Sequence, residues 1–533
     1  MAILRRIISL AWTSVIVLGV ANAQNTTSET PPAPPPAIAS GPSFQDARYV
    51  YRSGRFDDAI REYLQLTTGP KAAVAYAELT HIYLLKTDTA DAYAAAAKAK
   101  ELDPAAAETR VALGEVYFRQ GKLADAEAEF IAVINSGANN ARAYFCLALT
   151  SRAVSYYARE KRLLDKAHGL DPTDPDITPE WISTLPAEER TKALNDYLLQ
   201  GANGDPDTRK WLQSEIKLRQ TDPLADSHLC RMVSNTKASE IDLRPLPDEK
   251  DLEGYGLDVA VNGATSRLLL DTGADGILIT KKTAEKGHVT KIIDTRFAGF
   301  GDKKPARGYV GHADDIVIGD MEFHDCTVEV IEKGPMSDEG IVGPDVFSDF
   351  LVDMDMPHRK LRLGELPTRP GEAAHPPTLE LDPDAVPEFH DRYVSPEMKD
   401  YTPIFRFEHM LLIPTRVNDL PPKLFLIDTG AYTSIVTPET AREVTKVASE
   451  SDVEFEGLSG RVKKLYVGGE MTLTFAGLRQ TNLDILSFDE KNVSDSVGTE
   501  ISGTLGFRLL VLLDMKIDYR DGLVAFRFEP KNN

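Results

Sequence analysis

The chain has 533 residues, enough for several domains, and 42% of them are hydrophobic, which excludes wholesale disorder. Asp and Glu outnumber Lys and Arg by 82 to 60, so the formal net charge is −22 at pH 7. A surface with this charge repels phosphate backbones, and we therefore expect no binding to nucleic acid. Three cysteines without a CxxC pair exclude a disulfide-stapled mini-fold and the common zinc knuckles.

The N-terminus is typical of a secretory signal peptide. Two arginines at positions 5 and 6 precede a mostly apolar stretch at 7–20, and Ala21-Asn22-Ala23 supplies the small residues that a signal peptidase requires. The stretch is short for a bilayer span, which needs ~20 apolar residues. We expect cleavage before Gln24, export to a periplasm or to the medium, and no stable membrane span afterwards. In such a compartment disulfides form, but the sequence leaves open whether any two of the cysteines pair: Cys146, Cys230 and Cys326.

Shifts in composition divide the chain into seven segments. The expected segments are a signal peptide (1–23), a Pro-rich linker (24–43), helical repeats (44–220), a connector (221–245), a first β-rich lobe (246–366), a second Pro-rich linker (367–399) and a second β-rich lobe (400–531). The predicted fold class is therefore multidomain, with an all-α repeat region followed by two all-β lobes.

The helical region repeats with a period of 34 residues. Pro70, Pro104, Ala138 and Pro172 keep this interval. The best unit combines these residues: Leu113, Gly114, Tyr117, Gly121, Ala126 and Phe130. The pattern resembles the tetratricopeptide repeat, in which each unit is a pair of antiparallel helices. The resemblance implies a concave groove for a peptide or a partner protein. The alternative is a rigid spacer without a ligand.

The two β-rich lobes share one motif. Each has an apolar run that ends in Asp-Thr-Gly-Ala, at 271–274 and at 428–431, and the two Asp are 157 residues apart. A Gly-x-x-Gly element follows at 340–343 and at 503–506, beginning 69 and 75 residues after the respective Asp. Because two such elements recur in the same order, we infer an internal duplication.

These motifs resemble those of the aspartic peptidases, and the first copy is especially similar to the retroviral type. The resemblance implies an endopeptidase that acts on a peptide or protein substrate without a metal or another cofactor. Asp271 and Asp428 are the expected catalytic dyad. Two carboxyl groups held close together share one proton, so that one can activate a water while the other protonates the leaving nitrogen.

The resemblance also assigns supporting roles. Thr272 and Thr429 are expected to hydrogen-bond across the axis between the lobes. Gly273 and Gly430 are expected to let backbone amides approach the carboxylates. Ala274 and Ala431 stand where pepsin-like enzymes often carry Ser, whose hydroxyl would lower the pKa of the dyad, so we expect activity at a milder pH.

Substrate contacts are expected on both sides of the dyad. Asp275 matches the retroviral Asp that contacts the substrate backbone, whereas the second copy has Tyr432 at this position. The retroviral Arg after the second Gly is absent from the first copy, where Pro344 follows. Gly-rich stretches that suit the tips of closing flaps supply four further candidates: Gly299, Gly301, Gly457 and Gly460.

Three interpretations remain open from the sequence. The first is an exported single-chain aspartic endopeptidase with a repeat arm for protein binding. The second is a catalytically inactive scaffold that kept the fold for peptide or protein binding. The third is an enzyme in which each lobe pairs with its twin in another chain. Two intact Asp-Thr-Gly motifs favour an enzyme, because binding alone would not require two carboxylates.

Overall fold

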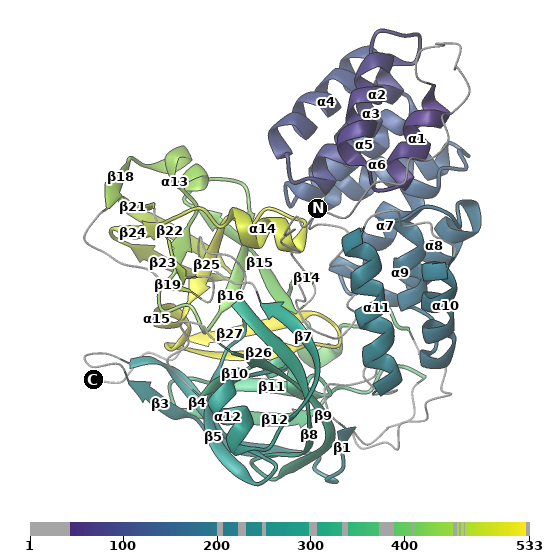
Figure 1. Ribbon diagram of the computed structural model, residues 1–533. Helices are drawn as coiled ribbons and strands as arrows, with labels where there is room; N and C mark the ends of the chain where they lie inside the picture. Colours follow the sequence, from purple (N-terminus) through teal and green to yellow (C-terminus); the bar gives the residue numbers. More distant parts are fainter. Residues whose placement is uncertain are drawn as a thin grey trace, which may run out of the picture.

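The computed structural model describes residues 43–199, 206–221, 231–247, 252–297, 306–332, 339–371, 389–407, 409–450, 456–457, 460–462 and 464–528. The expected signal peptide and nearly all of the first linker lie outside these residues. An all-α array is followed by two β lobes (Figure 1), which confirms the predicted fold class. In the described part of the chain, no helix has both the length and the apolar character that a bilayer crossing needs.

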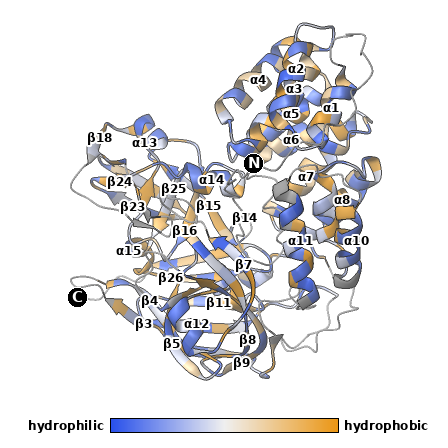
Figure 2. Ribbon diagram, viewed as in Figure 1, coloured by the Kyte–Doolittle hydropathy of each residue, from blue (hydrophilic) through white to orange (hydrophobic). Residues whose placement is uncertain are grey.

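The N-terminal array is built from helix pairs. Its helices are α1 (Phe44–Arg52), α2 (Phe56–Leu66), α3 (Ala72–Leu85), α4 (Thr89–Leu102), α5 (Ala107–Arg119), α6 (Leu123–Asn135), α7 (Ala141–Ala153), α8 (Tyr157–Leu170), α9 (Ile177–Ser183), α10 (Ala187–Leu199) and α11 (Pro206–Thr221). Polar and apolar residues alternate around them (Figure 2), as expected for helices that bury one face. Gly114 on α5 allows close packing, because a Cβ there would lie 2.4 Å from the ring of Phe130 on α6.

A buried polar network links the units of the array. His81 on α3 lies 3.0 Å from a carboxylate oxygen of Glu115 on α5 and 3.1 Å from one of Asp176, which precedes α9. Arg142 on α7 contacts both carboxylates. Burial and Arg142 lower the pKa of His81, but the two carboxylates outweigh them and raise it to about 9. Successive repeats are therefore joined by charge pairs as well as by apolar packing.

Lobe 1 is a barrel. Its strands are β1 (Arg231–Met232), β3 (Arg244–Pro247), β4 (Leu252–Val261), β5 (Ala264–Leu270), β6 (Ile277–Thr280), β7 (Thr290–Phe297), β8 (Ala306–Ile318), β9 (Met321–Ile331) and β10 (Gly340–Val342), with the short helix α12 (Lys281–Lys286) and the 3-10 turn η1 (Pro344–Phe347). The order is β1-β9-β6-β10-β5-β4-β8-β7, with β3 beside β4, and a further β9–β8 pairing closes the sheet.

Lobe 2 repeats this plan. Its strands are β14 (Phe405–Phe407), β15 (Met410–Val417), β16 (Lys423–Asp428), β17 (Ile435–Val436), β18 (Val447–Glu450), β21 (Leu465–Gly468), β22 (Met471–Phe475), β23 (Leu478–Asn482), β24 (Ile485–Ser487) and β25 (Gly503–Gly506); its helices are α13 (Pro438–Val444), α14 (Lys491–Val497) and α15 (Phe507–Leu510). The order is β18-β21-β24-β17-β25-β16-β15-β22-β23, and β14 pairs with β15.

A sheet of six strands joins the two lobes within the chain. Its order is β13 (Thr402–Pro403), β27 (Leu523–Phe528), β26 (Leu513–Asp518), β11 (Phe350–Asp355), β12 (Lys360–Glu365) and β2 (Ser239–Asp242). At its centre β11 of lobe 1 pairs antiparallel with β26 of lobe 2, from Leu351↔Asp518 to Asp355↔Asp514. One core cluster contains buried side chains of both lobes, so they pack as a single unit.

Part of the connector expected at 221–245 forms strands. Residues 231–232 form β1, which pairs with β9, and β2 at the edge of the six-stranded sheet pairs with β12. The sequence of β2, Ser-Glu-Ile-Asp, is short and polar and gives little sign of a strand. Its hydrogen bonds to β12, and not a hydrophobic pattern of its own, hold β2 at the edge of the sheet.

The second linker is partly anchored. Its described C-terminal part contacts the array, where Tyr157 N donates to His390 O (3.1 Å) and Arg159 N donates to Asp391 Oδ1 (2.8 Å). It also contacts lobe 2, where Arg392 Nε donates to Asp521 O (2.7 Å). Residues 389–392 therefore lie between the array and lobe 2.

The described cysteines differ in state. Cys326 takes part in a disulfide, whereas Cys146 on α7 is a free, buried thiol. Cys230 lies outside the described residues. The sequence had left the pairing open, and the placement of Cys146 in the helical core agrees with its apolar surroundings.

Candidate active site

Two strands deliver the Asp-Thr-Gly loops to the junction of the lobes. β5 ends one residue before Asp271, and β16 ends at Asp428. Each lies beside the strand of its Gly-x-x-Gly element, β5 beside β10 and β16 beside β25, in parallel. Asp271 N donates to Val342 O (3.0 Å), and Phe507 N donates to Ala431 O (2.7 Å). The second element of each motif therefore fixes the loop that carries the Asp.

The two loops interlock through their threonines. Thr272 Oγ1 donates to Ile427 O (2.8 Å) and accepts from Thr429 N (2.9 Å). The partner bonds mirror these, since Thr429 Oγ1 donates to Leu270 O (2.8 Å) and accepts from Thr272 N (3.0 Å). Both threonines are about 1% exposed. Four hydrogen bonds in a buried setting thus hold the lobes in one relative position.

The glycines place each loop against the opposite carboxyl group. A Cβ on Gly430 would lie 2.2 Å from Asp271 Oδ2, and a Cβ on Gly273 would lie 2.8 Å from Asp428 Cγ. Gly430 N donates to Asp428 Oδ1 (2.8 Å) and also to Asp271 Oδ1 (3.2 Å). Only glycine fits these two positions without moving a carboxyl group.

The two carboxyl groups lie side by side, with Asp428 buried and Asp271 half-buried. Burial raises the pKa of Asp271, and burial together with the nearby Asp271 raises the pKa of Asp428 well above its ordinary value. Backbone amides oppose this shift, because Gly273 N donates to Asp271 and Ala431 N to Asp428. Two adjacent carboxyl groups with these pKa shifts retain a proton between them at a higher pH than isolated ones.

The surroundings of the dyad differ between the lobes. In lobe 1, Asp275 Oδ1 lies 3.6 Å from His409 Nδ1, which comes from lobe 2. Behind it Asp345 accepts from Gly276 N (3.1 Å), and burial with the nearby Asp275 raises the pKa of Asp345 to about 6. In lobe 2, Arg508 Nη1 donates to Tyr432 Oη (3.1 Å) and stacks over its ring.

His409 and Asp345 were absent from the sequence-based site. His409 precedes Asp428 by 19 residues and meets Asp275 only because the lobes pair, so no local motif could reveal it. Asp345 follows the Gly-x-x-Gly element of the first copy by two residues, and the equivalent position of the second copy is Arg508. Aligning the two copies shows an acidic residue in one and a basic residue in the other at this position, and this difference could have revealed Asp345 from the sequence.

The flap candidates are described in part. Gly457 and Gly460 pair with each other at the closed end of a small hairpin, β19 (Glu456–Gly457) and β20 (Gly460–Arg461). Gly299 and Gly301 lie outside the described residues. The strands that lead to them, β7 and β8, pair up to Phe297↔Ala306. A hairpin is therefore described for the candidates of lobe 2, and for lobe 1 only the paired strands on either side of the candidates are described.

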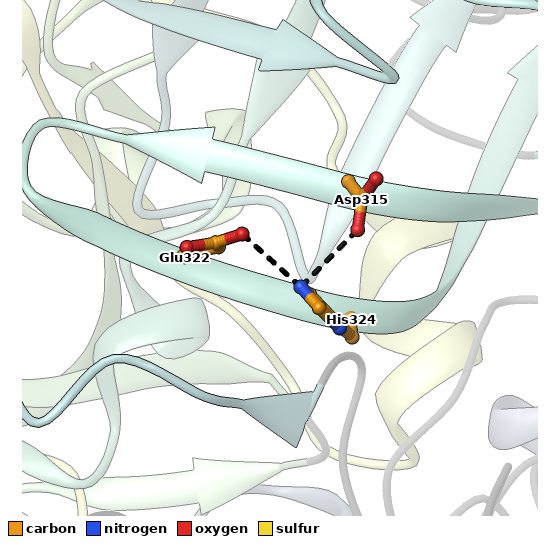
Figure 3. A group of neighbouring side chains, drawn as sticks. All are labelled: Asp315, Glu322 and His324. Carbon is orange, nitrogen blue, oxygen red and sulfur yellow. Dashed lines mark hydrogen bonds and ion pairs between the residues drawn. The ribbon is translucent and has the colours of Figure 1, made fainter.

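In the described part of the chain, three side chains on the β8–β9 hairpin lie close enough together to hold a metal ion: Asp315, Glu322 and His324 (Figure 3). His324 Nε2 lies 3.2 Å from Asp315 Oδ1 and 3.2 Å from Glu322 Oε1. All three side chains are at least one-third exposed, and ion pairs between one imidazole and two carboxylates account for the arrangement. The cluster lies away from the loops that carry Asp271 and Asp428 in sequence, and it gives no reason to assign a metal.

Family comparisons agree with this geometry. The family model for the aspartyl protease of gag polyproteins matches residues 257–349, and a second model, aspartyl protease, matches residues 413–509. The matched segments contain one Asp-Thr-Gly loop and one Gly-x-x-Gly element each. The two lobes are aspartyl-protease domains of the retropepsin-like type. The predicted resemblance of the lobes is thereby confirmed, and the helical repeats precede them in the same chain.

Relatives among known proteins are distant. Protein DDI1 homolog 2 of Xenopus tropicalis is 22% identical over 224 residues, which cover 38% of this chain and 56% of that protein. Its human counterpart is 22% identical over 204 residues, covering 35% and 50%. The UBA domain-containing protein Mud1 of Schizosaccharomyces pombe is 27% identical over 109 residues, covering 20% and 32%. The chain spans about half the length, or less, of these relatives.

Proposed function

We propose that this protein is an aspartic endopeptidase whose dyad consists of Asp271 and Asp428 from the two lobes of one chain. The observation that carries the proposal is the interlocked pair of Asp-Thr-Gly loops, in which Thr272 and Thr429 exchange hydrogen bonds and each glycine contacts the opposite carboxyl group. The lobes are joined by the β11–β26 pairing of a single chain. This supports a dyad within one chain over one formed between chains.

In the proposed mechanism the dyad shares one proton. The ionised carboxylate takes a proton from a water as that water attacks the peptide carbonyl, and the protonated carboxyl group donates to the forming diol. The proton that was taken up then passes to the leaving nitrogen. Amides of Gly273, Gly430 and Ala431 donate to the carboxylate oxygens and so keep both groups oriented for these transfers.

Substrate is proposed to bind in an extended form between the dyad and the two flap hairpins. An extended peptide presents its backbone amides to groups on both lobes and its side chains alternately to either side. The supports are Asp275 beside the dyad and the Gly457–Gly460 hairpin in lobe 2. The flap of lobe 1, with Gly299 and Gly301, is assigned by the same logic from the sequence.

Cleavage of an unstructured protein tests the proposal. The mature chain should cleave it, a pepstatin-like inhibitor should block cleavage, and Asp271→Asn and Asp428→Asn should each abolish it. Asp314→Asn serves as a matched control, because its side chain is 82% exposed on β8 and the same charge is removed. Each variant is compared by its thermal unfolding, so that loss of fold is separated from loss of chemistry.

The alternatives make different predictions in the same assay. An inactive scaffold binds unstructured peptides without cleaving them in any of the four proteins. An enzyme assembled from twin lobes of two chains retains substantial activity when one Asp is replaced, since the other lobe still pairs with its own copy. Sedimentation of the active species as a monomer would exclude such an assembly.

Export is also proposed. It is supported by the signal-like sequence at 1–23 and by the disulfide of Cys326, since disulfides form and persist mainly in oxidising compartments. Expression of the full chain in a bacterial host, followed by fractionation and N-terminal sequencing, tests this. A periplasmic protein that starts at Gln24 supports export, and an uncleaved cytoplasmic protein contradicts it.

A protein partner for the helical array remains a proposal as well. The described array already contacts lobe 2, because Tyr93 Oη donates to Glu500 Oε1 (2.6 Å) and Thr499 Oγ1 donates to Phe118 O (2.8 Å). The rings of Phe118 and Phe407 meet edge to face with centroids 5.7 Å apart. Any external partner would therefore use array surface that lobe 2 does not cover. We propose that the array holds such a partner protein beside the active site.

A further inference from the structure

Three acidic side chains gather on lobe 1 next to the dyad. Asp275 follows the Asp-Thr-Gly-Ala loop directly, and its side chain is 22% exposed. Its negative charge acts on Asp345 and on Glu329 of β9, since it contributes to the raised pKa of both, after burial. The cationic groups that act on Asp345 are His409 and Arg406, both from lobe 2. Among the described residues named here, acidic groups thus outnumber cationic ones in this corner of the site.

Glu329 points to the flap side of the sheet. In a strand successive side chains alternate between faces, and its neighbours Val328 and Val330 belong to the main core. Glu329 therefore lies on the opposite face, together with Ile331. On that face Ile331 packs with Leu278 and with Phe297, the last described residue before the flap candidate of lobe 1. The carboxyl group lies close enough to Asp275 for the charge of Asp275 to contribute to its raised pKa.

The carboxyl group of Glu329 lacks a partner among the described residues. The residue is 7% exposed, and its Oε1 makes no hydrogen bond. Burial raises its pKa well above the ordinary value, and the charge of Asp275 adds to this. A buried carboxyl group without a donor costs free energy, which a cationic group entering from the cleft would recover.

Lobe 2 lacks each of these acidic groups at the equivalent position. Leu278 and Ile435 both stand seven residues after the Asp of their lobe, and the residues that pair with them in parallel are Glu329 and Leu486. Leu486 packs in the apolar cluster beside Phe488. By the same alignment the position of Asp275 is taken by Tyr432, and that of Asp345 by Arg508. The two halves of the cleft therefore carry different charges.

We propose that Asp275 and Glu329 form an acidic subsite in lobe 1 that accepts a Lys or Arg side chain of the substrate. The inference rests on the proposed peptidase function and gives it a substrate class: peptides with a basic residue near the cleaved bond. Asp275, which is half-buried, forms the entrance, and the buried Glu329 forms the far end, which suits a long aliphatic stem with a charged head. Tyr432 and Leu486 line the equivalent subsite in lobe 2, which selects against the same side chain there. A bound peptide is thereby oriented in one direction across the two lobes.

A randomised decapeptide library tests the subsite. Cleavage by the wild type should enrich Lys or Arg at one position relative to the cleaved bond by at least about tenfold, since a charged hydrogen-bonded pair is worth about that factor or more. In Glu329→Gln and Asp275→Asn the kcat/KM ratio for a Lys peptide over its norleucine twin should fall about tenfold. Asp314→Asn, which removes an exposed carboxylate of β8, should leave the ratio unchanged.

Exchanging the lobe residues sharpens the test. Glu329→Leu gives lobe 1 the residue of lobe 2, and it should turn the preference at that position towards apolar side chains. Cleavage of the library without a basic preference, or with a preference that survives Glu329→Gln, overturns the subsite and leaves the peptidase intact.

Binding of library peptides to the Asp428→Asn variant provides a second readout. If the bound peptides show a basic preference that depends on Glu329 while the wild type cleaves none of them, that result supports the subsite and overturns the peptidase function. If the library is neither cleaved by the wild type nor retained by Asp428→Asn, both the subsite and the peptidase function are overturned.

Discussion

Thr272 Oγ1 accepts a hydrogen bond from Thr429 N at 2.9 Å, and Thr429 Oγ1 accepts one from Thr272 N at 3.0 Å. Each hydroxyl also donates to a carbonyl of the opposite lobe, so every bond of this set crosses the interface. The threonines are 157 residues apart, yet they are the closest link between the two loops that carry the dyad. Rigid placement of the carboxyl groups depends on this link.

Replacement of one threonine should therefore loosen the dyad and weaken the lobe contact. Thr272→Ala leaves Thr429 N and Ile427 O buried without partners, which should lower the free energy of unfolding by about 2 kcal/mol and reduce cleavage by more than tenfold. Urea unfolding and kcat/KM for a peptide measure the two effects. Thr272→Ser retains the hydroxyl and should stay close to the wild type. Equal losses in the Ser and Ala variants would show that the methyl group, and not the hydrogen bonds, matters.

The pH profile of cleavage should reflect the raised pKa values of the dyad. The proposed reaction needs one ionised and one protonated carboxyl group, so raising both pKa values moves the bell-shaped profile to higher pH. With Ala274 and Ala431 in place of Ser, no hydroxyl lowers these values, and we expect an optimum above about pH 3. Ala431→Ser should move the profile towards acid, because its hydroxyl would stabilise the ionised form. An optimum below about pH 3 would contradict this account.

Much of this arrangement could be predicted from the sequence, and the missing parts share a physical cause. The Asp-Thr-Gly and Gly-x-x-Gly elements and the period of 34 residues are local patterns, so they predicted the lobes and the array. The pairing of His409 with Asp275 depends on how the lobes meet. Glu329 and Leu486 each stand 58 residues after the Asp of their lobe, so spacing agrees with their equivalence in strand register, but the burial of Glu329 near Asp275 depends on how the sheet folds. Neither the contact of His409 with Asp275 nor the burial of Glu329 near Asp275 follows from a local motif.

Glu490 should make stability depend on pH in lobe 2. It precedes α14, is 2% exposed, and accepts from Thr504 Oγ1 (2.8 Å), while its Oε2 lacks a described partner. Burial raises its pKa from 4.5 to about 8. The folded state therefore holds the proton more tightly than the unfolded chain. The resulting stability is complete below about pH 4.5 and is lost as the pH rises to about 8.

Glu490→Gln should remove this dependence. The amide oxygen can still accept from Thr504, and no charge has to be buried at high pH. The variant should gain on the order of a few kcal/mol over the wild type at pH 8, with a much smaller difference at pH 4. Urea unfolding at both values measures this. Asp314→Asn, as an exposed carboxylate variant, should follow the wild type, and parallel curves for Glu490→Gln and the wild type would refute the assignment.

Arg119 should couple the helical array to lobe 2. It is 3% exposed at the end of α5, and its guanidinium donates to Asp495 Oδ1 (2.6 Å) and Ser494 O (3.4 Å) on α14. Arg119→Ala removes both bonds, although Asp495 keeps its pair with Lys491, so we expect a loss of about 1–3 kcal/mol and faster hydrogen exchange in α14. Arg61→Ala, at an exposed ion pair of α2, should cost at most about 1 kcal/mol and leave α14 unchanged. Unchanged exchange in α14 of Arg119→Ala would mean that the array and lobe 2 open independently.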